Sequence, residues 1–570
     1  MFNSMLMASF ASKLVNGIEK GNAKLNSIVW GWPMIVLILG VGLLLTVITK
    51  CLQVRKFGTS VDKTLGDTFR SVKKKGKHLS KKENSVSPFE AFATAISGTV
   101  GTGNIVGVSS AIMTGGPGAV LWMWISAFFG MVTNYAENVL GMFFRKKEKD
   151  GEFSGGPAYY LSEGIGRGVT GKKGSFLRGL GKVLAVMAAV FCLFAAIGMS
   201  GVQTTKMAQT IQSAGDSLAG GISKKAKFWI AMVVGIVVAI VLALVILGGI
   251  KSIGRTTAIL IPFMSLLFIL MALVIICMNI TMVGTAFALI FKNAFKFKSA
   301  VAGFSGYMFA QIIQKGLARG VFSNEAGLGS SVIAHSASET REPVKQGLWG
   351  IFEVFFDTFI ICTLTALVIL VSFGDAAGMN NVLYKQVVDP ETGKFVLAYA
   401  DTAVSMKAFS DAFGKFGEIT YSIIIPLFAF TTILAWAYYG EKSIDYLFRK
   451  TGEKGRKISR FVFKCLYVVL VVVAAWLVTQ DGKGDLMWAI SDTANGLMAL
   501  PNLIGLAFMC TLVAKITKNY FDRKNGKDVK PMLSAYEEQN EQFIKELEFE
   551  EDSENNVAEE VAVAENTDAE

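Results

Sequence analysis

Residues Ala91–Ile112, with the sequence AFATAISGTVGTGNIVGVSSAI, are numerous and apolar enough to span a lipid bilayer, but they do not suit one continuous helix. Four glycines interrupt the stretch, and each costs about 1 kcal/mol relative to alanine inside a helix. Because the hydrocarbon core contains no water, an unwound turn is tolerated there only where protein groups or a watery cavity satisfy its backbone. The stretch therefore predicts a broken helix whose free peptide groups and small hydroxyls face a ligand.

A second stretch near the middle of the chain, Lys315–Ser336, has the same character and reads KGLARGVFSNEAGLGSSVIAHS. Its glycines surround Glu325, and an acidic residue at membrane depth is costly enough that a functional role is the default interpretation. Two glycine-interrupted membrane segments at corresponding places in two halves of a chain are the best sequence indication of a transporter's binding site. We therefore expect both breaks to contribute to one ligand site.

The composition predicts a membrane protein with many spans. Of the 570 residues, 52% are hydrophobic and 18% are charged, whereas soluble domains average about 25% charged residues. The net charge of +12 does not indicate nucleic-acid binding, because Lys and Arg gather in short loops beside apolar runs, where they determine topology. We expect about eleven membrane-spanning helices, at residues 28–49, 90–114, 117–144, 182–211, 227–249, 255–278, 306–336, 347–372, 415–440, 461–479 and 485–515.

The loop charges also predict an orientation. Arg55–Lys82 is rich in lysine and arginine, and positively charged loops usually face the cytoplasm. We therefore expect a protein of the plasma membrane with this loop and the C-terminus in the cytoplasm and the N-terminus outside. The acid-rich segment Tyr536–Glu570 contains few large apolar residues. Such a segment buries too little surface to fold alone, so we expect a disordered tail.

A broken helix offers groups for both an anion and a cation. Its second half presents free N–H groups and a positive dipole end, which suit a carboxylate. Its first half ends in free carbonyls, which suit a small cation. One break therefore supplies a site for an amino acid together with a cation. The sequence pairs no nucleophile with a nearby base, so we expect a transporter and not an enzyme.

The glycine clusters are also compatible with three different kinds of structure. Close helix packing through small residues is the strongest of these, although packing does not require Asn104, Ser323 and Asn324. GTGNIVG has the spacing GxGxxxG and follows no strand, unlike a dinucleotide site. GTVGTGN is similar to the filter of potassium channels, which lies in a re-entrant loop. A cation channel and a membrane sensor that signals through the acid-rich tail remain as alternatives.

Six longer motifs carry a resemblance to a known family: SGTVGTGNIVGVSSAIMTGGPGAVLWMW, AENVLGMFFR, GGPAYYL, RGVFSNEAGLGSSVIAHS, FDTFIICTLTALVI and FAFTTILAWAYYGE. From Ile28 to about Lys515 the chain resembles the alanine or glycine:cation symporter family. The resemblance implies sodium-coupled import of a small neutral amino acid, alanine or glycine. Proton coupling and a larger substrate such as glutamine are the alternatives within this class.

The resemblance also implies a leucine-transporter (LeuT-type) fold, in which two inverted five-helix repeats follow one extra helix and each repeat begins with a discontinuous helix. The expected divisions are an extracytoplasmic lead at 1–27, the extra helix at 28–50, a basic cytoplasmic loop at 51–89, repeat one at 90–278, an extracytoplasmic connection at 279–305, repeat two at 306–515 and a basic-then-acidic, disordered cytoplasmic tail at 516–570.

The same resemblance implies roles for individual residues. Thr102, Gly103 and Asn104 are expected to hold the substrate carboxylate, and Gln203 to bind its polar groups. Residues of the second break are expected to wall the pocket and to accept the ammonium through their carbonyls; these are Gly320, Phe322, Ser323 and Asn324. Trp436 is expected to close the site on its apolar side, which favours a small substrate.

A sodium ion is expected between the first break and the helix that carries FAFTTILAW. Its ligands would be the carbonyls of Ser97 and Val100 and the hydroxyls of Thr431 and Thr432, although threonines in a helix also bond ordinarily to helix carbonyls. Lys206 departs from the family pattern near the outer end of its span. It is expected to extend outward to the interface, or alternatively to alter cation coupling or substrate size. Arg319 and Glu325 are a candidate gate pair.

Overall fold

The structure is a computed structural model that describes residues 17–68, 70, 86–148, 151–295, 302–384, 386–388, 395–397, 401–480 and 484–549. Residues 71–85 of the basic loop expected at 51–89 lie outside the described part. Within it, the strands form only two short hairpins, β1–β2 (Lys146–Lys147 and Phe153–Ser154) and β3–β4 (Gln386–Val388 and Phe395–Leu397). Helices predominate because a membrane-spanning segment has to satisfy its backbone polar groups within itself.

The helices follow one another with short connections. The first group comprises α2 (Trp32–Ile48), α3 (Leu52–Arg55), α4 (Phe57–Val61), η1 (Asp62–Gly66), α6 (Pro88–Thr99), η2 (Thr102–Asn104), α7 (Val106–Gly115), α8 (Ala119–Phe143), α9 (Pro157–Gly164), α10 (Gly171–Ala219), α11 (Lys224–Leu247) and α12 (Gly249–Met278). The second group comprises η3 (Ile280–Met282), α13 (Val283–Ala294), α14 (Ala302–Asn324), α15 (Ser331–His335), α16 (Pro343–Val354), η4 (Phe355–Cys362), α17 (Thr363–Phe373), α18 (Ala376–Gly378), η5 (Met379–Leu383), α19 (Asp401–Phe413), α20 (Lys415–Leu447), α21 (Gly452–Leu477) and α22 (Gly484–Lys524).

Eight single helices of the described residues are long and apolar enough to cross a membrane, and two bent pairs raise this number to ten. One bent pair is Gly17–Val29 with α2, and the other is α6 with Thr102–Gly115, bent by 56°. The remaining predicted span, 306–336, corresponds to α14 and α15, which are interrupted between Asn324 and Ser331 and are not among these ten. The prediction of an all-helical membrane protein with a discontinuous helix at the start of each half is confirmed.

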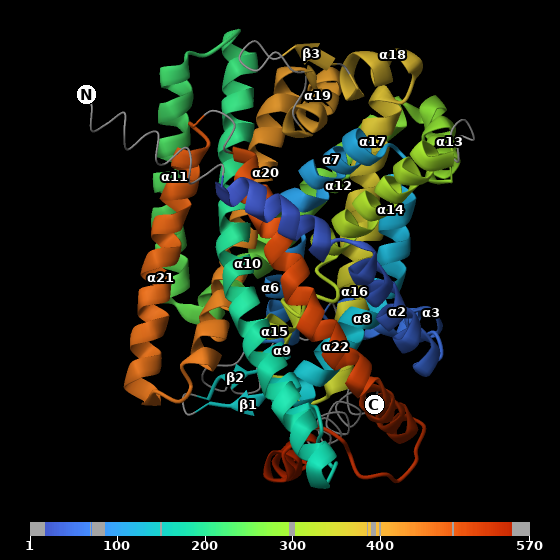
Figure 1. Ribbon diagram of the computed structural model, residues 1–570, viewed down its shortest axis with the longest axis vertical. Coiled ribbons are helices and arrows are strands. Elements are labelled where there is room, and N and C mark those ends of the chain that lie inside the picture. Colours follow the sequence, from blue (N-terminus) through green and yellow to red (C-terminus); the bar gives the residue numbers. More distant parts are fainter. Residues whose placement is uncertain are drawn as a thin grey trace, which may run out of the picture.

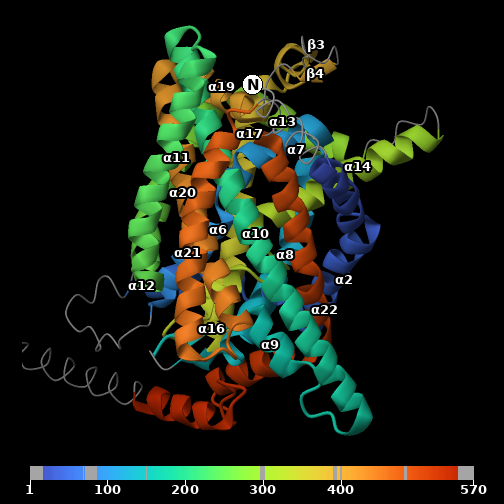
Figure 2. The ribbon, with the colours of Figure 1, turned by 60° about the vertical axis from the view of Figure 1, so that its left-hand side comes forward.

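Counterpart helices of the two halves pack against each other (Figures 1 and 2). Helices α6 and α7 contact α15 and α14, α8 contacts α16, α10 contacts α20, and α11 contacts α21. This pairing is expected of two inverted five-helix units that are related by a pseudo-twofold axis. It brings the two breaks together inside the bundle. The repeat boundaries at 90–278 and 306–515 remain predictions.

The C-terminal segment is ordered further than we expected. After α22, residues 537–549 form a helix that lies across one end of the bundle in Figure 2. Phe543 packs on Phe153 of β2 with ring centroids 6.0 Å apart, and Glu546 forms an ion pair of 2.5 Å with Arg341. The prediction of a disordered tail at 516–570 is therefore wrong as far as residue 549, because a few apolar residues are enough for docking onto an existing surface. Residues 550–570 lie outside the described part.

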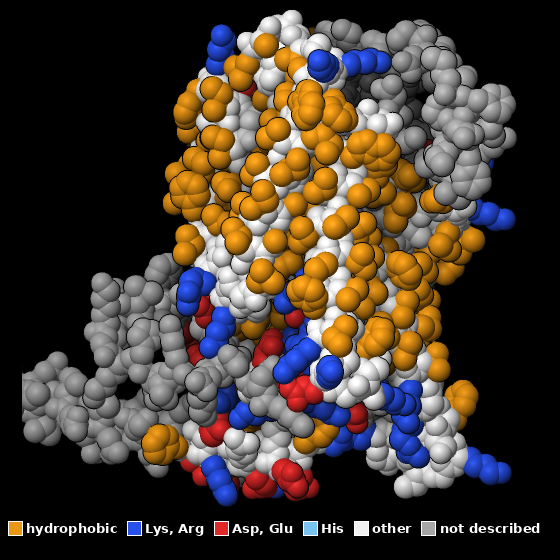
Figure 3. Space-filling model, turned by 90° about the vertical axis from the view of Figure 1, so that its left-hand side faces the viewer, with side chains coloured by type: hydrophobic (Ala, Val, Ile, Leu, Met, Phe, Trp, Pro, Cys, Tyr) orange, Lys and Arg blue, Asp and Glu red, His pale blue; other side chains and the backbone are white. Residues whose placement is uncertain are grey.

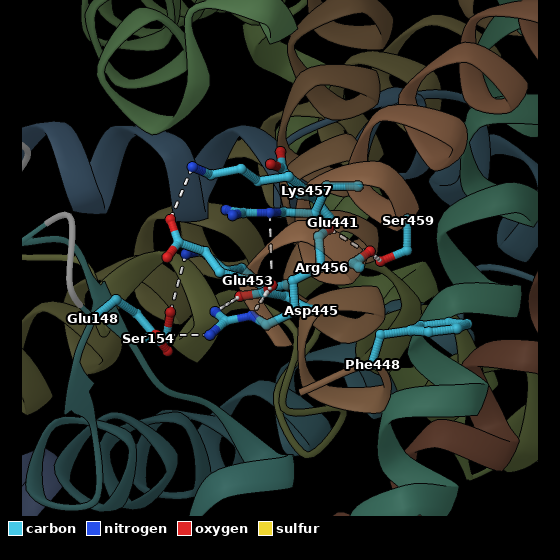
Figure 4. Close-up of polar contacts among 12 residues, drawn as sticks. Glu148, Ser154, Glu441, Asp445, Phe448, Glu453, Arg456, Lys457 and Ser459 are labelled. Carbon is cyan, nitrogen blue, oxygen red and sulfur yellow. Dashed lines mark hydrogen bonds and ion pairs between the residues drawn. The ribbon is translucent and has the colours of Figure 1, made fainter. Parts of the chain in front are cut away.

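The outer surface of the bundle is typical of contact with lipid. Figure 3 shows a broad apolar band with charged side chains gathered below it. Leu244 of α11 and Leu466 of α21 are among the exposed apolar side chains. Among the charged side chains, Arg456 donates hydrogen bonds to Asp445 at 2.6 and 2.8 Å (Figure 4). It also donates a hydrogen bond of 3.1 Å to Glu148, which lies beside β1. These charge-assisted bonds tie the β1–β2 hairpin to α20 and α21.

Candidate substrate and cation site at the two broken helices

The first break follows a well-defined helix start. Ser87 and Glu90 form a reciprocal capping box at the beginning of α6. The helix ends after Thr99, and the chain passes through one short turn, Thr102–Asn104, before α7 begins. A Cβ atom on Gly101 would lie 2.4 Å from the Thr432 hydroxyl oxygen of α20. Glycine is therefore required for this close approach of the unwound backbone to α20.

The second break is built from left-handed backbone. Glu325 has φ 55°, and Gly327 and Gly329 have φ 92° and 75°. A non-glycine residue in this region costs of order 1–3 kcal/mol and persists only when its surroundings hold it. Two donors hold the Glu325 carboxylate, which is 1% exposed: Trp436 Nε1 at 2.9 Å and Ser330 Oγ at 2.5 Å. Trp436 of α20 therefore donates a hydrogen bond to the second break, which the sequence analysis did not predict.

Asn104 joins the two breaks. Its Oδ1 accepts a hydrogen bond of 2.9 Å from the Gly101 amide, and its Nδ2 donates to Ser323 Oγ at 2.8 Å and to the Asp357 carboxylate. Ser323 in turn donates to Asp357 Oδ2 at 2.7 Å. All of these side chains are fully buried. The side chain of Asn104 is thus occupied by protein groups, so any contact of this residue with a carboxylate would come through its backbone.

Two polar atoms at the first break have no hydrogen-bond partner among the described residues. They are Thr102 Oγ1 and Gln203 Nε2, and both side chains are at most 1% exposed. Gln203 Oε1 accepts from the Thr102 amide at 3.2 Å, which holds the glutamine of α10 against the unwound turn. A buried polar group without a partner costs about 1–3 kcal/mol. These two atoms are therefore the best candidates for contact with a polar ligand.

Aromatic rings close one side of the break. The Phe322 ring stacks on Trp488 of α22 with centroids 5.2 Å apart and an angle of 19°. A Cβ atom on Gly103 would lie 3.3 Å from the Phe322 ring. The ring therefore rests on the unwound turn, as expected for a pocket wall. Gly320 instead faces Ser126 and Met123 of α8, where a Cβ atom would approach within 2.9 Å, so its small size serves helix packing.

The predicted sodium ligands lie on two elements that meet. The end of α6 packs on α20, since Cβ atoms on Gly98 and Gly101 would touch Ala435 and Thr432. Both Thr431 and Thr432 also donate to the carbonyl of Phe428 at 3.0 Å, and Ser97 Oγ donates to Thr94 at 2.7 Å. The ordinary helical bonds are therefore present. They leave hydroxyl lone pairs available, and an all-oxygen set suits a hard alkali cation.

Two sequence interpretations need correction. Lys206 does not extend outward to the interface, because its side chain is 5% exposed and forms an ion pair of 2.9 Å with Asp401 of α19. Arg319 and Glu325 do not form a gate pair. Arg319 lies 3.5 Å from Asp492 of α22, while Glu325 is held by Trp436. Both basic side chains pair with acids on helices that are far away in the sequence.

The most important residue that the sequence analysis missed is Asp357. It belongs to the quoted motif FDTFIIC and accepts bonds from Asn104, Ser323 and Thr358. The sequence does indicate a functional role for Asp357, because an acidic residue inside an apolar run at membrane depth is energetically costly. Asn324 reaches the same cluster through its bond of 3.1 Å to Thr358. Asp401 lies between two predicted spans and Trp488 is not acidic, so neither carried this signal, and Asp492 lies close to the start of the predicted span 485–515.

Comparison with known proteins identifies the family of this chain. The family model described as the sodium:alanine symporter family matches residues 15–534. The chain is 40% identical to the sodium/alanine symporter AgcS of Methanococcus maripaludis over 505 residues, which cover 88% of this chain and 97% of that protein. It is 33% identical over 532 residues to the amino-acid carrier protein AlsT of Bacillus subtilis, covering 93% and 96% of the two chains.

The protein described as "probable sodium/glutamine symporter GlnT" of the same bacterium is 32% identical over 507 residues, covering 88% of this chain and 91% of that protein. Among solved structures, MhsT in complex with L-phenylalanine aligns with a TM-score of 0.49 and 14% identity over 76% of this chain and 98% of that one. The family match spans nearly all of the membrane region and both breaks. The chain belongs to the sodium:alanine symporter family.

Proposed function

We propose that this protein imports a small neutral amino acid, alanine or glycine, together with sodium by alternating access around the two breaks. The observation that carries the proposal is the pair of unpartnered buried atoms, Thr102 Oγ1 and Gln203 Nε2, beside an unwound turn. A zwitterion supplies partners for both. In this proposal the Thr102 hydroxyl and the Gln203 amide group bind the carboxylate together with the backbone amide of Gly103, and carbonyls at the end of α14 accept the ammonium.

The side chains that border the proposed substrate site limit the size of the substrate. Phe322 rests on Gly103, and Trp436 is fully buried and bonded to Glu325. We expect these two aromatic side chains to leave little room for a long substrate side chain, which favours alanine or glycine over glutamine. Similarity to GlnT keeps glutamine as the alternative substrate.

The charge of Asp357 supports coupling to a cation. Among the described residues its hydrogen-bond partners are all neutral: Asn104, Ser323 and Thr358. A buried carboxylate without a positive partner is strongly unfavourable, so a sodium ion or a proton is expected to accompany it. Sodium would bind as cargo at Ser97, Val100, Thr431 and Thr432, and coupling to a proton at Asp357 is the alternative.

We further propose that the protein lies in the plasma membrane and that the end of the bundle that carries residues 537–549 faces the cytoplasm. The basic residues of this end, among them Arg145, Arg341 and Arg456, agree with the general excess of positive charge on that side. The N-terminus would then lie outside.

Uptake into proteoliposomes tests the proposal. Labelled alanine, glycine and glutamine are supplied with and without an inward sodium gradient. Alanine or glycine should accumulate only with the gradient. Equal accumulation without sodium, at neutral or acid external pH, would contradict sodium coupling, and current without any amino acid would indicate a channel.

A further inference from the structure

A groove with a volume of about 720 Å³ runs along the outer surface of the bundle, between α10, α20 and α21. Its lining is almost entirely apolar and includes Leu193 and Ile197 of α10 and one side of α21 from Gly455 to Leu470. Leu466 of this lining is more than half exposed. Helix α21 lies on the side of the bundle that carries the apolar band (Figures 1 and 3). We call this groove the α21 groove.

The dimensions of the α21 groove fit an extended hydrocarbon chain. Along α21 the lining runs from Gly455 to Leu470, which at 1.5 Å per residue is about 22 Å. One half of the hydrocarbon core of a bilayer is about 15 Å thick, so the groove can hold an acyl chain over the full depth of a leaflet. A helix of about 10 Å diameter occupies about 1,700 Å³ over the same length. The groove is therefore too small to enclose a helix of another protein or of a second copy.

Positive charges lie where the α21 groove ends. The turn that joins α20 to α21 contributes Phe448 and Thr451 to the groove lining (Figure 4). The same turn carries Arg449 and Lys450, and Lys454 follows at the start of α21. These three basic side chains are exposed, and within the described part of the chain none of them forms an ion pair. They are therefore available to a negatively charged group at the mouth of the groove.

The neighbouring charges are already paired with one another. Figure 4 shows Arg456 bonded to Asp445 and to Glu148. Five basic and four acidic side chains line the polar cavity of about 250 Å³ at this corner, which leaves one positive charge in excess. Arg449 is the basic residue of this lining without an ion pair among the described residues, and its guanidinium lies 3.8 Å from the centroid of the Tyr446 ring.

We propose that the α21 groove binds an anionic phospholipid, with one acyl chain in the groove and the headgroup phosphate held by Arg449, Lys450 and Lys454. Basic pockets between membrane helices on the cytoplasmic side are suited to anionic headgroups, and each basic side chain at such a surface contributes about fivefold in affinity. This corner belongs to the end of the bundle for which we propose a cytoplasmic location. The inference does not depend on which amino acid is transported.

The bound lipid lies behind the helix that carries the candidate cation ligands. Tyr467 of α21 lines the groove, and its buried hydroxyl donates a hydrogen bond of 3.0 Å to the carbonyl of Ile433 in α20. Ile433 directly follows Thr432 in the chain. A lipid in the groove therefore covers the contact between α20 and α21 beside this threonine, and we expect it to stabilise that contact.

Native mass spectrometry of the purified full-length protein in detergent measures the binding of single lipid molecules. Dioleoyl-phosphatidylglycerol and dioleoyl-phosphatidylethanolamine are titrated separately, because they share the acyl chains and the phosphate. The ammonium of phosphatidylethanolamine offsets the phosphate charge. The first phosphatidylglycerol should therefore bind at least tenfold more tightly than the first phosphatidylethanolamine.

Substitution of the three basic residues tests the headgroup site. Arg449→Gln combined with Lys450→Gln and Lys454→Gln should lower the affinity for phosphatidylglycerol at least tenfold and leave the affinity for phosphatidylethanolamine within twofold. All three positions are exposed, so the variant should fold normally.

A matched variant separates this effect from a loss of net charge. Lys172, Lys173 and Lys182 are exposed basic residues of α10 outside the groove lining. Their combined replacement by glutamine changes the net charge by the same amount and should leave the affinity for phosphatidylglycerol unchanged.

A bulky side chain tests whether the acyl chain occupies the groove. Val462 lines the groove, whereas Val473 of the same helix lies outside the lining, and both are exposed. Val462→Trp should lower the affinity for phosphatidylglycerol at least fivefold, and Val473→Trp should leave it unchanged.

Each contrary result overturns the lipid site. Equal affinities for the two lipids, or an equal loss in the α10 lysine variant, would mean that only the general positive charge of this end attracts lipid. Phosphatidylglycerol binding that survives Val462→Trp would exclude the groove as the chain site, and a dimer that Val462→Trp dissociates would assign the groove to a second copy. The uptake assay tests the proposed function separately, because none of these measurements involves an amino acid.

Discussion

The bond between Trp436 and Glu325 should be essential for the shape of the second break. Trp436→Phe keeps an aromatic ring but removes the Nε1 donor that lies 2.9 Å from Glu325 Oε1. Removing one partner of a buried hydrogen bond leaves the other partner unsatisfied, which costs about 1–3 kcal/mol. Glu325 already sits in left-handed backbone with φ 55°, so only Ser330 would remain to hold it.

If transport requires this geometry, a loss of about 1–3 kcal/mol should lower the initial rate of alanine uptake about 5- to 140-fold, since each 1.4 kcal/mol is a factor of ten. The assay is uptake into proteoliposomes at a matched amount of inserted protein. Trp124→Phe is the control, because Trp124 Nε1 donates a bond of the same length, 2.9 Å, to the neutral hydroxyl of Thr363. It should cost only about 0.5–1.5 kcal/mol of stability.

A second substitution tests whether the loss of the bond between Trp436 and Glu325 causes this effect. Glu325→Leu removes the acceptor that Trp436→Phe leaves without its donor, so the double variant should be less impaired than the sum of the single effects, with a coupling of about 1 kcal/mol or more. If Trp436→Phe transports as well as Trp124→Phe, or if the two substitutions are additive, the second break does not depend on this bond and the reasoning is refuted.

Three further predictions concern the first break, the cation and the tail. Asn104→Ala should abolish high-affinity alanine binding while the protein still inserts, because the amide bridges Gly101, Ser323 and Asp357; normal binding measured by equilibrium dialysis would reject the role of the bridge. Thr431→Ala combined with Thr432→Ala should raise the sodium concentration for half-maximal uptake about tenfold, and unchanged sodium dependence would remove the cation from α20. Deletion of 536–570 should preserve uptake but lower the melting temperature by several degrees, because it removes the Phe543 and Glu546 contacts; complete loss of function would favour the sensor interpretation.

Part of this architecture could be predicted from the sequence because the signals are local. Glycines inside apolar runs of bilayer length indicate unwound turns, and Phe322 and Gln203 indeed lie at the first break. Asn104 lies just after the first break, as the sequence predicts, but its side chain contacts Ser323 of the other break and Asp357. That contact depends on the packing of α14 against α7, which no short sequence pattern specifies.

Some features depend on contacts between residues far apart in the chain. Lys206 and Asp401 are separated by 195 positions and meet only because α10 and α19 are neighbours. The helix at 537–549 docks because the ends of α8 and α16 and the β1–β2 hairpin already form a surface. The composition of the tail by itself indicates disorder, because composition carries no information about the surface on which the helix docks.

An experimental structure with alanine and sodium bound tests the central claim most directly. We predict density for the amino acid in contact with Thr102 and Gln203, between unwound segments at 100–105 and 325–330. A continuous helix through residues 99–105, or alanine density that touches neither of these side chains, would contradict the account.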